Sequence, residues 1–533
     1  MVQLKHVHRS LGILLTSRSN SYAEMEQSVT DVERNGSRKR QVFQRVFQKI
    51  RTNPDYRERV LLTICIYLSF TVIGGTKGQL GPALLDLIAI SGVDLAKGAF
   101  IVTSLYLGYT IGAVLNGVLY YRFRRTSLFS FCCFWMGIMT CAIPWCSNYA
   151  LMLGAHAFLG LFQGVVDAGG NAEVIKLWTK DSRTLVVGLH LVFNIGGVLS
   201  PLIIAPYLMT NVVVRNSSHH VEDQAYAPNC TNGDNNVLRC SAINLSTSNT
   251  TFENTTISML GDGQKFTSKI HIAYIISAVS CLLVAFLFMS LYFSKKWKCF
   301  VHSIGVATEN DGTGGEVSKK EKSQLKLTRT FKIVALVVMI TISTLSKAID
   351  HAFAAYLSAF CVDALHWSTQ NSSYLTSAYF VCVVIGGACG TIMTKVTSLI
   401  MYEGLQVALM LVSFICLALS VTHSAAAGIW VAASLFGFAK SVIFPLTLAW
   451  TNDSFVKISG KISSVFFTST MAGSVTNPLL LGYIMTKFSK MWFCYFFLIE
   501  SILLLIFYII AVLLTKHAKH ICRDNDSEQF DIT

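Results

Sequence analysis

Residues 159–178 read LGLFQGVVDAGGNAEVIKLW, a mostly apolar stretch with the acidic residue Asp167 near its middle. A run of about 20 such residues can cross a bilayer as a helix. A carboxylate at that depth is costly, so it usually faces a cavity, a partner charge or a bound ion. Gln163 and Asn171 lie four residues before and after Asp167, which puts the three polar side chains on one helical face. The stretch therefore predicts a membrane helix whose polar face is directed at something polar.

The composition of the whole chain agrees with a membrane protein. Of its 533 residues, 53% are hydrophobic and only 14% are charged, whereas soluble domains carry about 25% charged residues. We predict an all-α membrane protein with twelve transmembrane helices in two six-helix halves. The predicted spans lie near residues 60–88, 98–121, 127–146, 150–177, 184–209, 269–293, 330–361, 372–395, 397–420, 425–450, 461–486 and 491–515.

The basic residues indicate how the chain is oriented in the membrane. The net charge is +14, but the lysines and arginines cluster in the termini and the even-numbered loops, not on a face that could bind nucleic acid. The short odd-numbered loops carry almost none. By the positive-inside rule both termini are cytoplasmic. We expect a multi-pass protein of the cell membrane.

Polar segments divide the chain into regions. The C-terminal segment contains an acidic stretch, RDNDSEQFDIT (523–533), that we expect to be solvated and disordered. The predicted regions are a cytoplasmic N-terminal region with a basic amphipathic helix (1–59), a first six-helix half (60–293), a cytoplasmic linker (294–328), a second half (329–515) and a cytoplasmic tail (516–533).

The first half contains a long polar loop, residues 210–268, between the fifth and sixth spans. The topology places this loop outside, where Asn-x-Ser/Thr sequences are glycosylated. Cys230 and Cys240 lie in the same loop, and an oxidising compartment favours a disulfide between them. The sequence predicts glycosylation at Asn216, Asn229, Asn244, Asn249 and Asn254.

Ionisable residues recur deep within every third span. This spacing is typical of three-helix repeats in which one helix of each repeat faces a central cavity. The residues are Lys77 in span 1, Asp167 in span 4, Lys347, Asp350 and His351 in span 7, and Lys440 in span 10. We predict that they contribute to a substrate or ion site.

Two interpretations stay open for each of these charges. Asp167 forms a static pair with Lys77, its expected partner, or takes part in transport. Lys347 and Asp350, at i and i+3, satisfy each other within one helix, or Asp350 accepts a coupling ion or a sugar hydroxyl. Lys440 forms an inter-helix ion pair or serves as a gate.

Span 1 also contains GGTKGQLGP at residues 74–82. Its glycines and Pro82 permit a kink or a local break that exposes backbone carbonyls to a substrate. The alternative is close packing against a neighbouring helix. Asp86, at the outer end of the span, is expected to be a wetted interface residue.

Motifs for enzyme chemistry, metal binding and nucleotide hydrolysis are absent: the sequence has no HExxH, GxxxxGK[ST] or CxxC pair. We therefore expect neither an enzyme, nor a metal site, nor a cofactor. Concentrative transport would use an ion gradient, with Na⁺ or H⁺ as the coupling ion.

Several motifs resemble a known family. The two six-span halves, the central linker and GVLYYRFRRTSL (117–128) are similar to the major facilitator superfamily, whose loop 2–3 has the pattern GxLaDrxGrr. Tyr121 replaces the acid and Arg124 the second glycine, so the usual Asp–Arg latch of that loop is altered. Further motifs are similar to the sodium-dependent glucose transporter 1 branch and its fucose permease-like relatives: GQLGPALLDL (78–87), GxxDxxxN in span 4, DHAFAAYLSAF (350–360), SVIFPLTLAW (441–450) and GKISSVFFTSTMAGSVTNPLLLGYIM (460–485).

The resemblance implies roles for particular residues. Asp167 matches the acid of span 4 used in sugar recognition or cation coupling, and Asn171 matches the asparagine one turn later. Asp350 takes the place of a glutamate common in span 7. The permease acid of span 1 aligns with Pro82, so a relay of two carboxylates is not carried over.

We predict a secondary active or facilitative transporter that moves a hexose such as glucose by alternating access, with cation coupling favoured and Na⁺ preferred to H⁺. Gln79, Gln163, Asn171 and Asn194 would bind sugar hydroxyls. The expected partners are a sugar and the lipid bilayer, without nucleic acid, and the protein is expected to be a monomer. The alternatives are transport of another solute such as an organic anion, favoured by the surplus of lysines, or a sensor or adaptor that does not transport.

Overall fold

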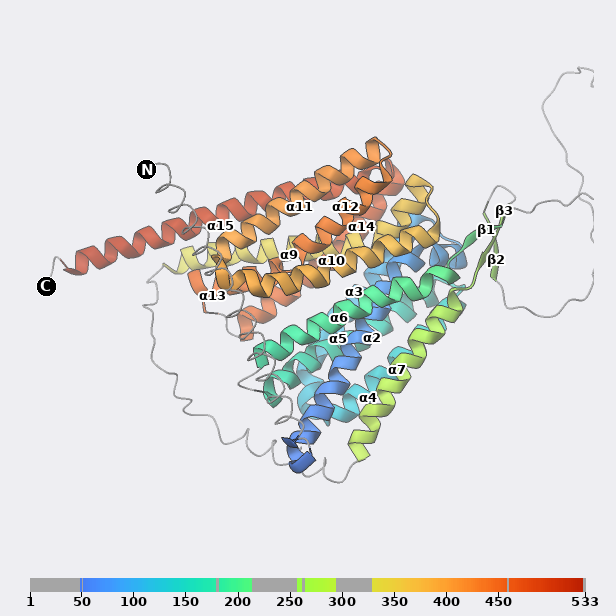
Figure 1. Ribbon diagram of the computed structural model, residues 1–533, viewed down its shortest axis with the longest axis horizontal. Helices are drawn as coiled ribbons and strands as arrows, with labels where there is room; N and C mark the ends of the chain where they lie inside the picture. Colours follow the sequence, from blue (N-terminus) through green and yellow to red (C-terminus); the bar gives the residue numbers. More distant parts are fainter. Residues whose placement is uncertain are drawn as a thin grey trace, which may run out of the picture.

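The computed structural model describes residues 48–49, 51–178, 182–212, 256–260, 264–293, 328–457 and 460–530. Within these residues long helices dominate, which confirms the predicted all-α membrane fold (Figure 1). The predicted glycosylation sites Asn216, Asn229, Asn244, Asn249 and Asn254 lie outside the described residues, as do Cys230 and Cys240 and most of the predicted amphipathic helix and linker.

The first half contains six membrane helices. They are α2 (Pro54–Ser91), α3 (Leu95–Arg122), α4 (Arg125–Ala142, extended by the 3-10 helix η1, Ile143–Trp145), α5 (Tyr149–Leu177), α6 (Ser182–Ile204, followed by η2, Ala205–Tyr207) and α7 (Ile270–Phe293). The second half contains α9 (Arg329–Leu365), α10 (Thr369–Val396), α11 (Leu399–Thr422), α12 (Ala426–Lys440) with α13 (Ile443–Ser454), α14 (Gly460–Lys487) and α15 (Trp492–Phe530).

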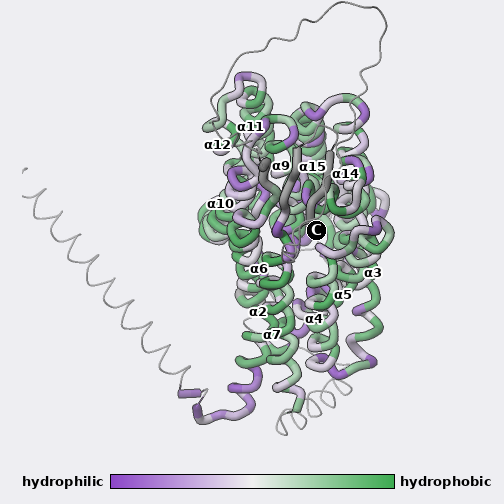
Figure 2. The backbone as a smooth tube through the Cα atoms, turned by 90° about the vertical axis from the view of Figure 1, so that its right-hand side faces the viewer, coloured by the Kyte–Doolittle hydropathy of each residue, from purple (hydrophilic) through white to green (hydrophobic). Residues whose placement is uncertain are grey.

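The helices have the length and composition of membrane spans. In the described part of the chain, 11 segments are long and apolar enough to cross a membrane, with α12 and α13 forming one of them. The remaining long helix, α14, has 28 residues and contains the more polar run TSTMAGSVTN. It packs against α9 and α3, which explains why it needs fewer apolar side chains. Figure 2 shows the hydrophobic character along the helices, with hydrophilic residues concentrated near their ends.

The two halves repeat one packing pattern. In the first half α2 packs on α6, α3 on α5 and α4 on α7; in the second, α9 packs on α14, α10 on α12 and α11 on α15. Between the halves, α3 contacts α14 and α6 contacts α10. This pattern makes α2 the counterpart of α9, α3 of α10, and α5 of α12. The halves are therefore related by pseudo-twofold symmetry, as inverted or parallel repeats of transporters often are.

Hydrogen bonds between the described helices join the two halves near one end. Ser373 Oγ on α10 donates to the Pro201 carbonyl on α6 (2.6 Å), and Ser377 Oγ donates to the Val198 carbonyl. On the other side of the bundle, Thr103 Oγ1 donates to the Val475 carbonyl (3.2 Å). These bonds lie in the part of the bundle nearest the small sheet, an end that we call the sheet end. Figure 1 shows the halves meeting there and spreading apart towards the opposite end.

A three-stranded antiparallel sheet sits at the sheet end, formed by β1 (Thr210–Val212), β2 (Thr256–Leu260) and β3 (Gln264–Ser268) in the order β1-β3-β2. Asp86 attaches this sheet to α2: its Oδ1 accepts from the Met209 amide (2.9 Å) and from Ser268 Oγ (2.5 Å). Asp86 is only 1% exposed. The expectation of a wetted residue was wrong, because the base of the 210–268 loop folds over this carboxylate.

The glycine-rich segment of span 1 does not interrupt its helix. α2 is continuous through Pro82, and its glycines make close contacts instead: Gly74 meets the Phe193 carbonyl of α6, and Gly81 meets the Ala354 carbonyl of α9. The break occurs in span 10, between α12 and α13. Pro445 explains it, because a proline four residues after Ser441 lacks the amide for that carbonyl and clashes with it.

The tail also differs from expectation. α15 continues through Phe530 rather than ending near residue 515. The acidic stretch from Arg523 to Phe530, expected to be disordered, is helical as a continuation of the final span. A helix that is already nucleated extends at little cost, since each added residue gains one backbone hydrogen bond.

Candidate functional site

Asp167 of α5 is held by two hydrogen-bond donors. Tyr109 Oη on α3 donates to Oδ2 of Asp167, and Asn171 Nδ2 donates to its Oδ1 (3.1 Å). The two helices can approach so closely because their glycines interlock: Gly164 of α5 meets the backbone of Tyr109, and Gly112 of α3 meets the backbone of Leu161. Small residues at such crossings let membrane helices pack backbone to backbone.

Lys77 of α2 does not form the expected ion pair with Asp167. Among the described residues no carboxylate oxygen lies within 4.0 Å of its ammonium. The ammonium instead lies over aromatic rings, 3.6 Å from the centroid of Tyr109, 5.6 Å from that of Tyr106 and 5.7 Å from that of Phe193. A cation over a ring face is stabilised by about 0.5–2 kcal/mol. Tyr109 thus lies between the two charges, with its ring under Lys77 and its hydroxyl on Asp167.

Asp350 of α9 lies in a comparable cluster in the second half. Lys440 Nζ is 2.6 Å from its Oδ1, and Lys347 Nζ is 3.7 Å from its Oδ2. Tyr379 Oη on α10 also donates to Oδ1 (2.5 Å). Both pairings considered from the sequence, Lys347 within the helix and Lys440 between helices, are present together. Lys440 is the last residue of α12, where the carbonyl end of the helix favours a positive charge.

His351 joins the two clusters across the halves. Its ring stacks on Tyr106 of α3 with centroids 4.6 Å apart, and Tyr106 also lies under Lys77. Nδ1 of His351 lies 2.6 Å from Ser474 Oγ on α14. The aromatic pair therefore connects helices from opposite halves at the depth of the buried charges.

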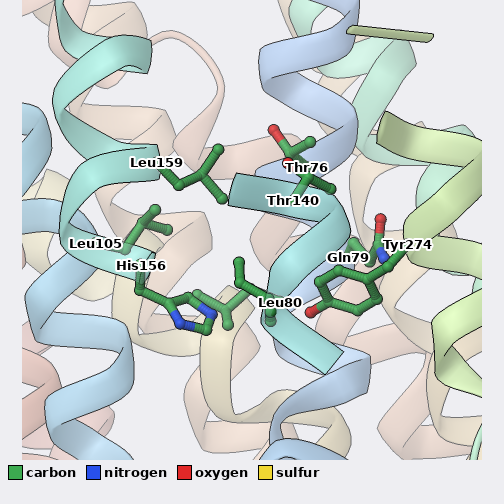
Figure 3. A pocket seen from close by; sticks show the side chains of 9 residues that line it. Thr76, Gln79, Leu80, Leu105, Thr140, His156, Leu159 and Tyr274 are labelled. Carbon is green, nitrogen blue, oxygen red and sulfur yellow. The ribbon is translucent and has the colours of Figure 1, made fainter. Parts of the chain in front are cut away.

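Two of the predicted sugar ligands point elsewhere. Gln163 is 0% exposed and donates through Nε2 to Thr76 Oγ1 (2.9 Å). Gln79 accepts from Ser277 Oγ of α7 (2.6 Å). Gln79 lines a small cavity inside the first half together with Thr76, Thr140, His156 and Tyr274 (Figure 3). The sequence predicted one shared face for Gln163, Asp167 and Asn171. Asn171 bonds to Asp167, but Gln163 bonds to Thr76 inside the first half.

The remaining predicted ligand, Asn194 of α6, is half-buried and donates to the His190 carbonyl (2.9 Å). His190 is exposed and close enough to Asp167 for their charges to interact. Sequence reasoning did not include His190 among the residues of the three-helix pattern. It missed Tyr109 and Tyr379 altogether, because neither is charged and a search for ionisable residues in membrane spans passes over them.

A second polar cluster closes α3, α4 and α5 at the end opposite the sheet. Arg125 Nε lies 3.2 Å from Glu173 Oε2, and Tyr120 Oη donates to the same oxygen (2.7 Å). Tyr121, which replaces the motif acid, is 84% exposed. Arg125, which matches an arginine of the loop motif, is therefore held by Glu173 of α5. The sequence did not mark Glu173 as a buried carboxylate, although it lies six residues after Asp167.

The hydroxyl of Tyr120 gives a direct test of this latch. We expect Tyr120→Phe to lower the free energy of unfolding by about 1–3 kcal/mol, because the variant leaves a charged, buried acceptor short of one donor. Tyr121→Phe, one residue on and exposed, should leave stability unchanged. Thermal melting of the purified proteins in detergent compares them, and equal melting temperatures for the two variants would contradict the latch.

A bundle of two pseudo-symmetric six-helix halves with charges buried at their interface defines the class of secondary transporters. Comparison with known proteins agrees. The family described as Major Facilitator Superfamily matches residues 60–216. The sodium-dependent glucose transporter 1 of Danio rerio is 22% identical over 434 residues, which cover 80% of this chain and 65% of that protein.

Two further comparisons cover more of the length of the compared protein. Major facilitator superfamily domain-containing protein 4A of Xenopus tropicalis is 23% identical over 512 residues, covering 89% of this chain and 95% of that protein. The crystal structure of a D-xylose-proton symporter superposes with a TM-score of 0.58 at 12% identity, covering 84% of this chain and 97% of that one. The chain is therefore similar to the major facilitator superfamily, and these similarities indicate a transporter rather than an enzyme.

Proposed function

We propose that this chain carries a hexose across the cell membrane by alternating access around Asp167, Asp350 and their tyrosines. The observation that supports it most is the combination of aromatic rings with compensated charges at the interface of the halves. Tyr106, Tyr109 and Phe193 carry the ammonium of Lys77 on their rings, and we propose that the apolar face of a pyranose stacks there once the ammonium moves away. Asp167, Asn171 and Asn194 supply acceptors and donors for its hydroxyls. The names of the relatives, a glucose transporter and a xylose symporter, favour a monosaccharide, and the glucose transporter favours a hexose.

The orientation proposed from the basic residues places the sheet end outside the cell. The bonds between Ser373 and Pro201 and between Thr103 and Val475 then close the extracellular side, so this conformation is inward-facing. The loop between β1 and β2 would carry the glycans and the Cys230–Cys240 disulfide.

Lys77 favours a second candidate, transport of an organic anion. A site in which every lysine pairs with a carboxylate would be near neutral and would favour a sugar. Lys347 and Lys440 both pair with Asp350. Lys77 lies on aromatic rings instead. An anionic solute could bind its ammonium. We rank the sugar first because Lys77 is already stabilised by Tyr109.

Uptake of labelled hexoses and of labelled organic anions by proteoliposomes tests both candidates. We expect hexose uptake, and we expect Asp167→Asn to lower it at least tenfold, because the amide no longer balances the charge of Lys77 and places a donor against Asn171. Asp453→Asn, an exposed residue at the end of α13, is the control and should transport normally. Uptake of an organic anion without hexose uptake would contradict the proposal.

The sequence led us to expect that Asp167 binds Na⁺ or a proton, or accepts a hydrogen bond from a sugar hydroxyl. The ammonium of Lys77 lies close enough to interact with the charge of that carboxylate, and so does His190. The proposed function therefore covers transport of the sugar alone. Whether a coupling ion binds at Asp167 depends on whether the ammonium of Lys77 neutralises that carboxylate.

A further inference from the structure

The two buried clusters contain the same three residue types on equivalent helices, with the charges exchanged. In the first half the order is Lys77 on α2, Tyr109 on α3 and Asp167 on α5. The equivalent helices α9, α10 and α12 carry Asp350, Tyr379 and Lys440. We call these the first and second triads. In each, the tyrosine hydroxyl donates to the aspartate and the lysine lies over the tyrosine ring, at 3.6 Å in the first triad and 5.3 Å in the second.

The matched residues also lie at similar depths. Lys77 is 14 residues from the sheet end of α2, and Asp350 is 15 residues from the sheet end of α9. Tyr109 and Tyr379 are 14 and 10 residues from the sheet ends of α3 and α10. The triads are therefore versions of one arrangement in two related halves.

The triads differ in whether lysine and aspartate touch. Lys440 Nζ and Asp350 Oδ1 are in contact at 2.6 Å, whereas Lys77 lies on the tyrosine ring and forms no ion pair with Asp167. The ring that carries Lys77 belongs to the tyrosine whose hydroxyl is bonded to Asp167. A change in the lysine side chain, with four rotatable bonds, can bring the ammonium to that carboxylate without moving a helix. The second triad shows the closed form that the first can adopt.

The surroundings of Lys77 restrict what else can neutralise Asp167. The charged and titratable groups around the ammonium are Tyr106 and Tyr109 on α3, Asp167 on α5, and Lys347, Asp350 and His351 on α9. His190 on α6 interacts with Asp167. Asp350 is already bonded to two lysines, so Asp167 is the carboxylate left for Lys77. A Na⁺ ion at Asp167 would be repelled by this ammonium.

We propose that Lys77 is a tethered cation of the transport site, which alternates between the Tyr109 ring and Asp167 and takes the place of an external coupling ion. Transport would then be facilitative, without a requirement for Na⁺ or H⁺. Removal of the ammonium should expose Asp167 and create a cation site there. The inference about transport rests on the proposed function, but the creation of a cation site does not.

Uptake of labelled glucose by proteoliposomes tests the first part. Replacement of Na⁺ by choline, or a change between pH 5.5 and 7.5, should alter wild-type uptake less than twofold. Lys77→Gln should take up less than a tenth of the wild-type amount in choline at pH 7.5, and Na⁺ or acid should raise its uptake at least fivefold. Lys490→Gln, which removes an exposed ammonium at the sheet end, is the matched control and should behave as wild type.

A double variant keeps the test decisive if Lys77→Gln is inactive in every condition. Lys77→Gln/Asp167→Asn removes both charges and should recover uptake that does not depend on cations. Wild-type uptake that requires a Na⁺ or H⁺ gradient would overturn the proposal. So would cation-independent uptake by Lys77→Gln, or a double variant as inactive as the single one.

Melting of the purified proteins separates this proposal from the identity of the substrate. NaCl, compared with choline chloride, should raise the melting temperature of Lys77→Gln by several degrees and leave the wild type unchanged, because a ligand that binds only the folded state stabilises it. Wild-type protein that fails to transport hexoses would overturn the proposed function alone. Stabilisation of the wild type by Na⁺, or none in Lys77→Gln by either Na⁺ or acid, would overturn the tethered cation.

Discussion

Replacing Asp350 with asparagine is expected to destabilise the protein strongly and to abolish transport. Lys440 has a side chain only 9% exposed, and Asp350 is its carboxylate partner at 2.6 Å. Removal of one member of a buried pair leaves an uncompensated charge and costs about 3–5 kcal/mol. Lys347 loses the same partner, but its side chain is 32% exposed and can reach water.

The matched control is Asp363→Asn, since Asp363 pairs with Lys490 where the side chains are 35% and 48% exposed. Exposed pairs contribute about 0–1 kcal/mol, so this variant should melt close to the wild type. Asp350→Asn/Lys440→Gln should regain part of the lost stability, because it removes the orphaned ammonium. Similar melting temperatures in detergent for Asp350→Asn and Asp363→Asn would show that the pair contributes little.

Gly164→Ala should also have a large effect, through the helix crossing and not through charge. A methyl group at this position would overlap the carbonyl oxygen of Tyr109 and lie 2.9 Å from the amide nitrogen of Ala113. Helix backbones yield little, so α3 must shift away from α5. Overpacking of this kind costs about 1–3 kcal/mol. It also pulls the Tyr109 hydroxyl from Asp167, so we expect hexose uptake to fall at least tenfold.

Gly154→Ala on the same helix is the control, because a methyl group there meets no atom within 4 Å. Alanine also favours a helix over glycine by up to about 1 kcal/mol. This variant should therefore transport normally and melt at or slightly above the wild-type temperature. If Gly164→Ala behaves in the same way, the contact between α3 and α5 does not position Tyr109.

Much of the fold could be predicted because the bilayer imposes simple requirements on sequence. A spanning helix must be apolar over about 20 residues, so the ends of α5 and α7 fall within one residue of the predicted spans. Breaks were harder to predict. Glycines and Pro82 in α2 indicated one, but neighbouring backbones fill the space beside them, and the break lies before Pro445 in span 10.

The site could be predicted only in part. Asp167, Lys77, Asp350 and Lys440 were identifiable because charge in a membrane helix is expensive and rarely accidental. Their partners were not identifiable. Tyr109 carries no charge, so nothing in its local sequence marks it as the residue between Lys77 and Asp167.

Insertion into lipid selects residues one helix at a time, so the sequence was enough to predict a two-half helical bundle in a membrane and several of its buried charges. Only the tertiary structure decided that Lys440 pairs with Asp350 while Lys77 lies on Tyr109. Pairing depends on side-chain distances of a few ångströms between helices far apart in the chain. Those distances are set by glycine contacts such as that of Gly164 with Tyr109, which no single helix contains.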